Sequence, residues 1–203
     1  MQGLYALKPW YSRRLGRVVQ FAVDRDLSPD VFTLLGVAGA VLAAICIAMG
    51  WWLPALLMLA ARLGGANLDG AVARARGVSR PWGFVLNEIG DRVSDLIVFA
   101  GLFALAARTD GATSWSALLT VTAAVAATLP TTASLAGAGA GAGATRRNGG
   151  PFGKTERCLA MVVATAFPAL IGWVCGVIIV GSLLTATLRL LGAHRELTER
   201  VTG

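Results

Sequence analysis

Acidic side chains interrupt an otherwise apolar part of the chain. Glu88, Asp91 and Asp95 stand immediately before the run 96–107, which has no charged residue. Together with Asn87 they are separated by three, four, seven and eight residues, which places all four within roughly a third of a helix circumference. Carboxylates within a membrane helix are costly unless they meet water, a cation or an opposite charge. This acidic face therefore predicts a functional site.

A second polar segment, RLGGANLDGAVARAR at 62–76, precedes the acidic face. Asp69 shares a helical side with Arg62 and Ala66, and Gly70 permits close approach of the backbone. Clustered carboxylates repel one another unless a cation neutralises them, and oxygen ligands of this kind suit Mg²⁺, Mn²⁺ or Ca²⁺. We therefore expect Asp69 to meet the acidic face around a divalent ion, with phosphate bound by nearby arginines: Arg74, Arg76 and Arg80.

An intramembrane ion-pair network is the alternative interpretation of the same residues. In it, Asp69 and Asp95 would pair with Arg62 and Arg92 to hold the helices together. Such a network leaves unexplained why acids, glycines and arginines gather at one membrane depth beside basic loops. The sequence therefore favours a metal and phosphate site.

Composition indicates the surroundings of this site. Of the 203 residues, 56% are apolar and only 14% are charged, compared with about 25% in a soluble domain. We therefore expect an all-α integral membrane protein, in which a span takes about 20 apolar residues. The basic residues that give the net charge of +7 lie between the apolar runs. This placement favours anionic lipid headgroups as partners and argues against nucleic acid. The uncharged runs are 31–49, 51–61, 96–107, 111–145 and 158–188.

Six membrane spans are predicted, in one domain over 1–203. A turn at Pro168 and Gly172–Trp173 divides the last run, although five spans remain an alternative. Six spans place nearly all basic clusters on the side of the N-terminus, which is the positive-inside pattern of a cytosolic face with both termini there. The segment 1–27 is interpreted as an amphipathic interfacial helix, or alternatively a basic tail, before a bundle over 28–195. The predicted spans are 30–50, 53–75, 84–107, 113–137, 156–172 and 174–193.

The order of these residues resembles the CDP-alcohol phosphotransferase family, whose signature reads D-x-x-D-G-x-x-A-R, eight residues, G-x-x-x-D-x-x-x-D. The chain reads A-N-L-D-G-A-V-A-R, eight residues, G-F-V-L-N-E-I-G-D over Ala66–Asp91. The segments SPDVFTLLG at 28–36 and GGPFGKTER at 149–157 are also similar to family segments. Asp69, Gly70, Ala73, Arg74, Gly83 and Asp91 match the signature at their spacings.

Two signature aspartates are replaced, by Ala66 and Asn87. In the family, four aspartates hold divalent metals, Mg²⁺ or Mn²⁺, over the pyrophosphate of a CDP-linked donor, and the last acts as base, which implies this role for Asp91. We expect Glu88 and Asp95, one turn from Asp91 on either side, to replace the missing carboxylates. The expected metal ligands are therefore Asp69, Asp91, Glu88, Asp95 and Asn87. Asn67 is less favoured, because it lies about 160° around the helix from Asp69. The departures also resemble a divergent bacterial branch of the family, which implies the inner membrane.

The resemblance implies transfer of a phosphatidyl or similar group from a donor such as CDP-diacylglycerol to an acceptor alcohol, with release of CMP. It also implies a homodimer, since the family often forms one. Two alternatives remain: a homologue that binds cytidine nucleotide or lipid without turnover, and an ion or proton transporter. The expected donor-binding residues are Asn67, Gly70, Ala73, Arg74, Arg76 and Gly83, and those for a phosphorylated acceptor are Arg146, Arg147, Lys154 and Arg157.

Overall fold

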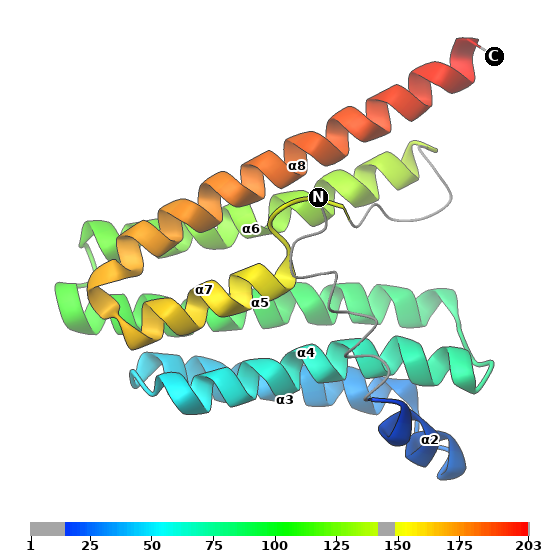
Figure 1. Ribbon diagram of the computed structural model, residues 1–203, viewed down its shortest axis with the longest axis horizontal. Helices are drawn as coiled ribbons and strands as arrows, with labels where there is room; N and C mark the ends of the chain where they lie inside the picture. Colours follow the sequence, from blue (N-terminus) through cyan, green and yellow to red (C-terminus); the bar gives the residue numbers. More distant parts are fainter. Residues whose placement is uncertain (1–14, 142–148, 203) are drawn as a thin grey trace.

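A computed structural model describes residues 15–141 and 149–202, and all regular elements within these ranges are helices (Figure 1). The first, α2, is short and precedes six longer segments. The elements in order are α2 (Gly16–Asp24), α3 (Pro29–Ala48), α4 (Trp52–Ala75), α5 (Pro81–Asp110), α6 (Trp115–Gly139), α7 (Lys154–Ala166), the 3₁₀ turn η2 (Pro168–Leu170) and α8 (Ile171–Thr202).

Local sequence signals explain where several helices begin. Ser28 caps α3, its hydroxyl accepting the backbone N–H of Asp30 at 3.3 Å, and Pro29 follows at the first helical position. Ser114 caps α6 in the same way, accepting the N–H of Ala117 at 3.2 Å. Pro81 opens α5, where its missing N–H costs nothing.

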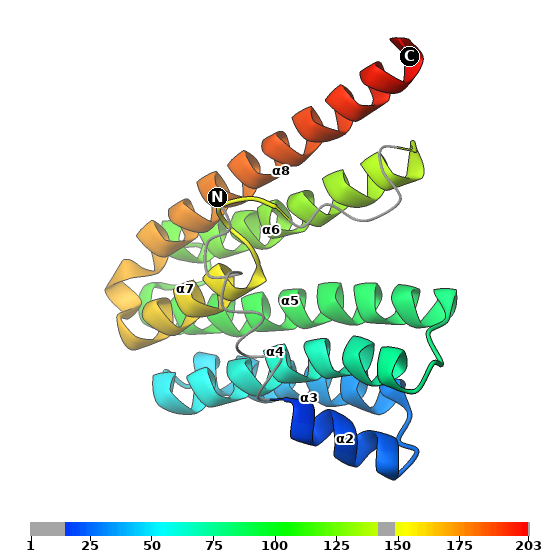
Figure 2. The same ribbon diagram turned by 45° about the vertical axis from the view of Figure 1, so that its right-hand side comes forward.

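The helices form two groups, which meet where α5 packs on α6 and through the short helix α7. α3 packs along both α4 and α5, α6 packs along α8, and α7 contacts α4 and α8. Figures 1 and 2 show α6 and α8 diverging from the α3–α4–α5 group toward the end where the C-terminus lies. The residues around α7 therefore add a second connection to the one that α5 and α6 make directly.

Backbone-to-backbone packing fixes α3 against its neighbours. A Cβ added at Gly65 of α4 would lie 2.8 Å from the backbone N of Gly36 and the backbone O of Phe32, and one at Gly101 of α5 would lie 2.5 Å from the backbone O of Ala44. Small residues permit such approaches between apolar helices. Because α4 and α5 both pack closely against the backbone of α3, the positions of their polar residues along the bundle axis are fixed relative to each other.

Three of the described helical segments are long and apolar enough to cross a bilayer: Pro29–Ala48, Trp115–Gly139 and Pro168–Glu199. α4 and α5 are longer than α3 but carry the charged residues of the polar segments. α7 has only 13 residues. The number of six spans therefore stays a prediction. The expected turn occurs at Pro168–Leu170, whereas Gly172 and Trp173 lie inside α8.

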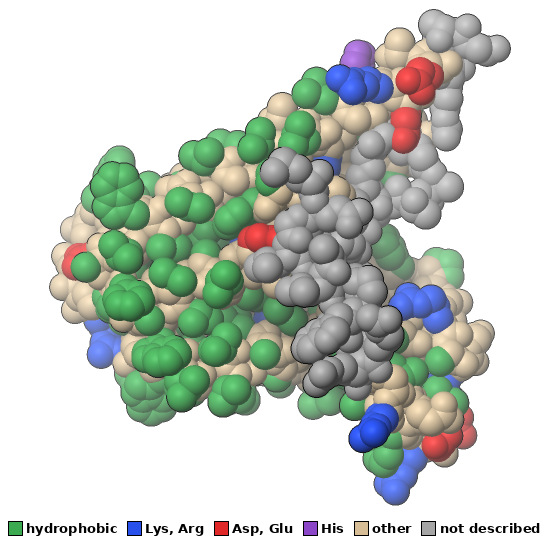
Figure 3. Space-filling model, in the orientation of Figure 1, with side chains coloured by type: hydrophobic (Ala, Val, Ile, Leu, Met, Phe, Trp, Pro, Cys, Tyr) green, Lys and Arg blue, Asp and Glu red, His purple; other side chains and the backbone are tan. Residues whose placement is uncertain are grey.

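Many apolar side chains are spread over the left-hand part of the surface shown in Figure 3, and charged side chains gather mainly at the end where α2 and the C-terminal part of α8 lie. α2 buries Ala22 against Leu68 and Val72 of α4, while Phe21 is exposed. The helix α2 lies within the segment 1–27, whose interfacial role stays a prediction, and residues 1–14 are outside the described part of the chain.

Candidate functional site

The two polar segments meet at a small cavity between α3, α4 and α5. Its lining includes the four positions of the aspartate signature, 66, 69, 87 and 91, together with Thr33 of α3. The cavity volume is about 10 Å³, roughly the space of one water-sized sphere. Asp69 and Asp91 thus face a common space that suits one small ion, while Ala66 and Asn87 occupy the positions of the missing carboxylates.

Asp69 is held in place by short hydrogen bonds. Thr33 donates its hydroxyl to Asp69 Oδ2 at 2.9 Å, and the backbone N–H of Gly70 donates to Oδ1 at 2.5 Å. The side chain is buried and no arginine pairs with it among the described residues. These two donors orient the carboxylate while leaving lone pairs for a further partner.

A larger cleft opens beside the small cavity and shares Thr33, Asp69 and Asn87 with it. Its volume is about 490 Å³, within the usual range for sites that hold small molecules or cofactors. Arg74 folds over Gly70, where an added Cβ would lie 3.1 Å from Arg74 Nη1. Five of the six expected donor-binding residues line this cleft: Gly70, Ala73, Arg74, Arg76 and Gly83.

The rim of the cleft is tied together by ion pairs. Arg76 donates to the backbone carbonyl of Leu27 at 2.7 Å and to Asp26 at 3.0 Å. Arg80 pairs with Asp30 at 2.5 Å. These contacts join the loop after α4 to the junction of α2 and α3, so part of the charge of Arg76 is already engaged by the protein.

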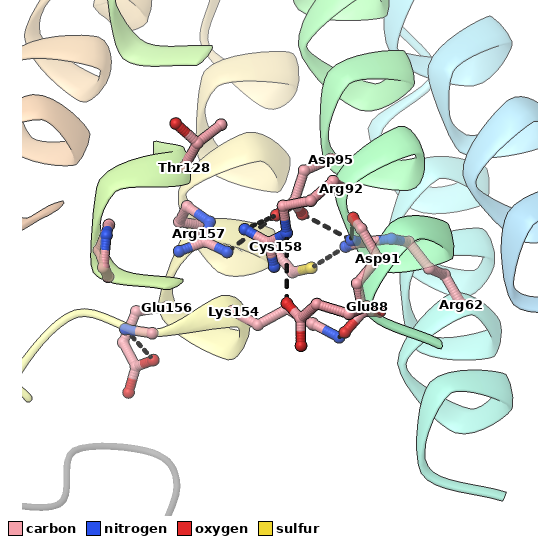
Figure 4. Close-up of polar contacts among 12 residues, drawn as sticks. Arg62, Glu88, Asp91, Arg92, Asp95, Thr128, Lys154, Glu156, Arg157 and Cys158 are labelled. Atoms are coloured by element: carbon pink, nitrogen blue, oxygen red, sulfur yellow. Dashed lines mark hydrogen bonds and ion pairs between the residues drawn. The ribbon is translucent and has the colours of Figure 1, made fainter. Parts of the chain in front are cut away.

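Asp91 contacts a cation from α7. Lys154, the first residue of α7, pairs through Nζ with Asp91 Oδ2. The start of α7 is stabilised by Glu156, whose side chain accepts the backbone N–H of Gly153 at 2.9 Å. Lys154 thus lies beside the carboxylate expected to act as base (Figure 4).

One turn deeper, Asp95 is the centre of a buried ion network. It accepts from Arg62 at 2.5 Å and from Arg157 at 3.0 Å, and Arg92 lies 3.4 Å away. Arg62 also donates to Cys158 Sγ at 3.4 Å and approaches the backbone carbonyl of Asp91 at 3.5 Å. Figure 4 shows this network linking α4, α5 and α7. Asp95 is only 6% exposed, and a buried charge is costly unless it is paired. The arginines provide this compensation.

The positions of Glu88 and Asp95 do not favour their predicted role as replacement metal ligands. Neither lines the cavity of Asp69 and Asp91; Asp95 pairs with arginines, and Glu88 lies 3.7 Å from Arg92. The ion-pair alternative therefore describes the surroundings of Asp95 but not those of Asp69. The structure brings Asn87 to the cavity, where its amide oxygen is available as a ligand.

Other predicted site residues are distributed less simply. The Asn67 amide donates to the carbonyl of Leu63 at 2.6 Å, and Asn67 lines neither the cavity nor the cleft. Arg157 is buried and pairs with Asp95, so its guanidinium is not exposed for binding a phosphorylated acceptor. Arg146 and Arg147 lie outside the described residues.

Two polar residues with specific contacts were not among the predicted site residues. Thr33 fixes Asp69, and Arg189 of α8 is buried, donating to the Gly149 carbonyl at 2.8 Å, the Pro130 carbonyl at 2.8 Å and Ser134 Oγ at 3.0 Å. The signal for Arg189 was its place directly after the uncharged run 158–188. A cation at the end of such a run can lie inside the protein or in the headgroup region, and the sequence does not separate the two.

The donor set fits one hard divalent ion that also binds substrate. No group of three or more His, Cys, Asp or Glu side chains in 15–141 and 149–202 forms a metal site by itself. Mg²⁺, however, is usually held by one or two carboxylates together with waters and substrate phosphates. In such a coordination shell, the protein ligands would be Asp69, Asp91 and the amide oxygen of Asn87.

Together these features define a membrane-embedded, all-helical protein with carboxylates and arginines around a polar cleft. The model of the CDP-alcohol phosphatidyltransferase family matches residues 26–191, and the chain belongs to this family. Among curated relatives, the phosphatidylinositol phosphate synthase of Mycobacteroides abscessus is 33% identical over 69% of this chain and 62% of its own length. That of Cutibacterium acnes is 30% identical over 53% of each chain. The matches thus span less than two thirds of either relative.

Solved structures share the fold. The crystal structure of Mycobacterium tuberculosis phosphatidylinositol phosphate synthase with CDP-DAG bound has a TM-score of 0.73 and 24% identity, covering 87% of this chain and 92% of that chain. The same protein in complex with manganese and citrate has a TM-score of 0.72 and 24% identity, covering 87% of each chain. The helical arrangement in Figures 1 and 2 is therefore that of a known fold.

Proposed function

We propose that this protein transfers a phosphatidyl or similar phospho-alcohol group from a CDP-linked donor, CDP-diacylglycerol, to the hydroxyl of an acceptor alcohol and releases CMP. The observation that carries the proposal is the continuity of the cleft, which holds Gly70, Arg74 and Gly83, with the cavity of Asp69 and Asp91. A donor bound along the cleft would have its pyrophosphate beside the carboxylates. The CDP-DAG complex of the structural relative supports this choice of donor.

The residues of the cleft have separate tasks in this reaction. Gly70 and Ala73 leave room for the nucleotide to approach the α4 backbone, and Arg74 supplies a charged donor to phosphate oxygens. Asn67, whose amide faces Leu63, is retained only as a support for this segment of α4. Arg76 combines donor binding with its contacts to Leu27 and Asp26.

Asp91 is the proposed base. Its carboxylate takes the proton of the acceptor hydroxyl, whose oxygen forms the new bond to the phosphatidyl phosphorus while the bond from that phosphorus to the CMP oxygen breaks. Lys154, beside Asp91 Oδ2, keeps the carboxylate oriented and offers a positive charge to an anionic acceptor. Asp69, fixed by Thr33 and Gly70, keeps a second carboxylate at the same cavity.

Mg²⁺ or Mn²⁺, held by Asp69, Asp91 and Asn87, would stabilise the negative charge that develops on the pyrophosphate. The manganese complex of the structural relative supports this cofactor. We assign Asp95 and Glu88 to the ion network rather than to this ligand set.

The acceptor is proposed to carry a phosphate of its own. The relatives named phosphatidylinositol phosphate synthase support a phosphorylated polyol. Lys154 is the cation that pairs with the proposed base, Asp91. Arg146 and Arg147 are proposed, from the sequence alone, to complete the acceptor site. Arg157 contributes by holding α7 through Asp95.

The proposed setting is the bacterial inner membrane, with one domain over 1–203, six spans, both termini and the cleft on the cytosolic side, and anionic lipids around the basic loops. A homodimer is the proposed assembly. The many exposed apolar side chains and the three apolar helices support a multi-pass arrangement (Figure 3).

Release of CMP tests the proposal directly. Purified protein receives CDP-diacylglycerol, Mg²⁺ or Mn²⁺, and in turn inositol phosphate, glycerol phosphate or serine, and the lipid product is identified by mass spectrometry. We expect CMP and a phosphorylated lipid product, both lost in Asp91→Asn. Asp110→Asn is the matched control, because Asp110 lies at the opposite end of α5 and is exposed.

Binding measurements separate the alternatives. A homologue that binds without turnover, which Ala66 and Asn87 would favour, retains cytidine nucleotide but releases no CMP with any acceptor. A transporter does neither and instead moves ions across proteoliposomes in a manner that depends on Asp91. Either result would replace the transferase proposal.

A further inference from the structure

The loop before α7 is anchored to one face of α8. Gly181 and Thr185 lie four residues apart on α8 and therefore share a face. Phe152 contacts this face at Gly181, where an added Cβ would lie 2.6 Å from Phe152 Cγ and 2.8 Å from Cδ2. Gly150 lies against Thr185 with a φ of +136°, a conformation that side-chain-bearing residues rarely adopt.

A buried hydroxyl secures the same contact. Thr185 is fully buried, and its Oγ1 accepts the backbone N–H of Phe152 at 3.1 Å while donating to the Gly181 carbonyl at 2.8 Å. We name Gly181 and Thr185 the α8 shelf. Phe152 thus has both its ring and its backbone fixed by the α8 shelf.

Only Gly153 separates this anchored residue from Lys154. The loop then enters α7, where Glu156 caps the Gly153 N–H and Lys154 pairs with Asp91. A displacement of Phe152 by the size of a methyl group would therefore be passed to Lys154 over two peptide bonds. Because α8 belongs to the α6–α8 group and Asp91 to the α3–α4–α5 group, the loop is a contact between the two groups, beside the direct packing of α5 on α6.

We propose that the α8 shelf, Gly181 and Thr185, consists of positioning residues that hold Lys154 against Asp91 through Phe152. Its catalytic consequence rests on the proposed function, since neither residue lines the cavity or the cleft. A displacement near 1 Å at a catalytic group can cost up to about 100-fold in rate. We expect a loss of about tenfold in kcat from shelf substitutions, with the KM for the donor unchanged.

The placement of Lys154 can be measured without turnover. The chain has two lysines, Lys8 and Lys154, so Lys8→Arg leaves Lys154 as the one lysine side chain for reductive ¹³C-methylation. Dimethylation retains the charge, and the methyl resonance reports on the carboxylate beside it. Asp91→Asn provides the resonance position of an amine released from that carboxylate.

Two variants of the α8 shelf, each with a matched control, test whether the α8 shelf positions Lys154. Thr185→Val keeps the shape but removes the acceptor for Phe152, whereas Thr185→Ser keeps the hydroxyl. Gly181→Ala adds a methyl group against Phe152, whereas Gly176→Ala adds one on the same helix with no atom within 4 Å. We expect Thr185→Val and Gly181→Ala to move the Lys154 resonance toward its Asp91→Asn position and the other two to leave it in place.

Thermal unfolding first establishes that each variant is folded. If the Thr185→Val and Gly181→Ala proteins are folded and keep the wild-type resonance, or if Gly176→Ala and Thr185→Ser move it as far, the inference is wrong. The resonance tests the shelf, whereas CMP release tests the proposed function, so the two can fail separately. In an active enzyme, Thr185→Val should cause no further loss of kcat once Lys154→Met is present, because a positioning residue acts through Lys154.

Discussion

Replacing Asp95 by asparagine separates a structural ion network from a metal ligand. Asp95 is buried, with Arg62 at 2.5 Å and Arg157 at 3.0 Å. Removal of one partner from a buried ion pair costs about 3–5 kcal/mol, because the remaining charges stay buried without compensation. Asparagine keeps the shape and one acceptor oxygen, so we expect a loss near the lower limit, about 3 kcal/mol in the free energy of unfolding.

The assay is unfolding of the purified protein by SDS in mixed micelles, with EDTA or with Mn²⁺. An ion that binds only the folded protein adds about 2.7 kcal/mol at a concentration of one hundred times its Kd. We expect the free energy of unfolding of Asp95→Asn to be about 3 kcal/mol below that of the wild-type protein in EDTA. We expect Mn²⁺ to raise it by the same amount as in the wild-type protein. Asp69→Asn is the control with the opposite pattern, because its partners are a hydroxyl and a backbone N–H rather than buried arginines.

The reverse result would refute the network. If Asp95→Asn is as stable as the wild-type protein in EDTA but no longer gains stability from Mn²⁺, then Asp95 is a metal ligand, as its helical spacing from Asp91 predicts. The three arginines around it would then have other partners in the folded protein.

Three further substitutions test the packing, the rim and the cleft. Gly101→Ala places a methyl group against the α3 backbone and should destabilise the protein by about 1–3 kcal/mol in the same unfolding assay, whereas Gly176→Ala, with open space around it, should be near neutral. Arg80→Gln should change the stability by less than about 1 kcal/mol, because the side chains of Arg80 and Asp30 are 55% and 38% exposed; a larger loss would mean that this pair holds the cleft closed. If the proposed function holds, Arg74→Ala should raise the KM for CDP-diacylglycerol by about tenfold with little change in kcat, since it removes the proposed charge-assisted hydrogen bond to the donor. An unchanged KM would remove Arg74 from the donor site.

The residues of the cleft were largely predictable because they are close in sequence. Positions 66–91 form the end of one helix, a short loop and the start of the next. Helical periodicity then determines which residues share a face, and the packing of neighbouring helices makes those faces meet. Gly70, Arg74 and Gly83, which the family resemblance named as donor-binding residues, line one cleft, and their binding role stays a prediction.

Partners from distant helices could not be predicted in the same way. Asp91 and Asp95 share a helix face, yet the first pairs with Lys154 and the second with Arg157, 62 residues along the chain from it. Periodicity gives the direction of a side chain but not the depth at which another helix supplies a counter-charge. The turn at Pro168 was visible from the sequence, whereas the early end of α7 at Ala166 was not, because the apolar run continues through it.

The length of α7 has a consequence for how reactants arrive. Its 13 residues rise about 20 Å, some 10 Å less than the hydrocarbon layer of a bilayer. If Ala166, at the end of α7, lies at the outer boundary of the hydrocarbon layer, then Lys154 and Asp91 lie about 10 Å inside its inner boundary. In the proposed reaction, an acyl-chain substrate would then enter from the leaflet at nearly constant depth, while a water-soluble reactant would have to move inward from the lipid surface to reach the same point.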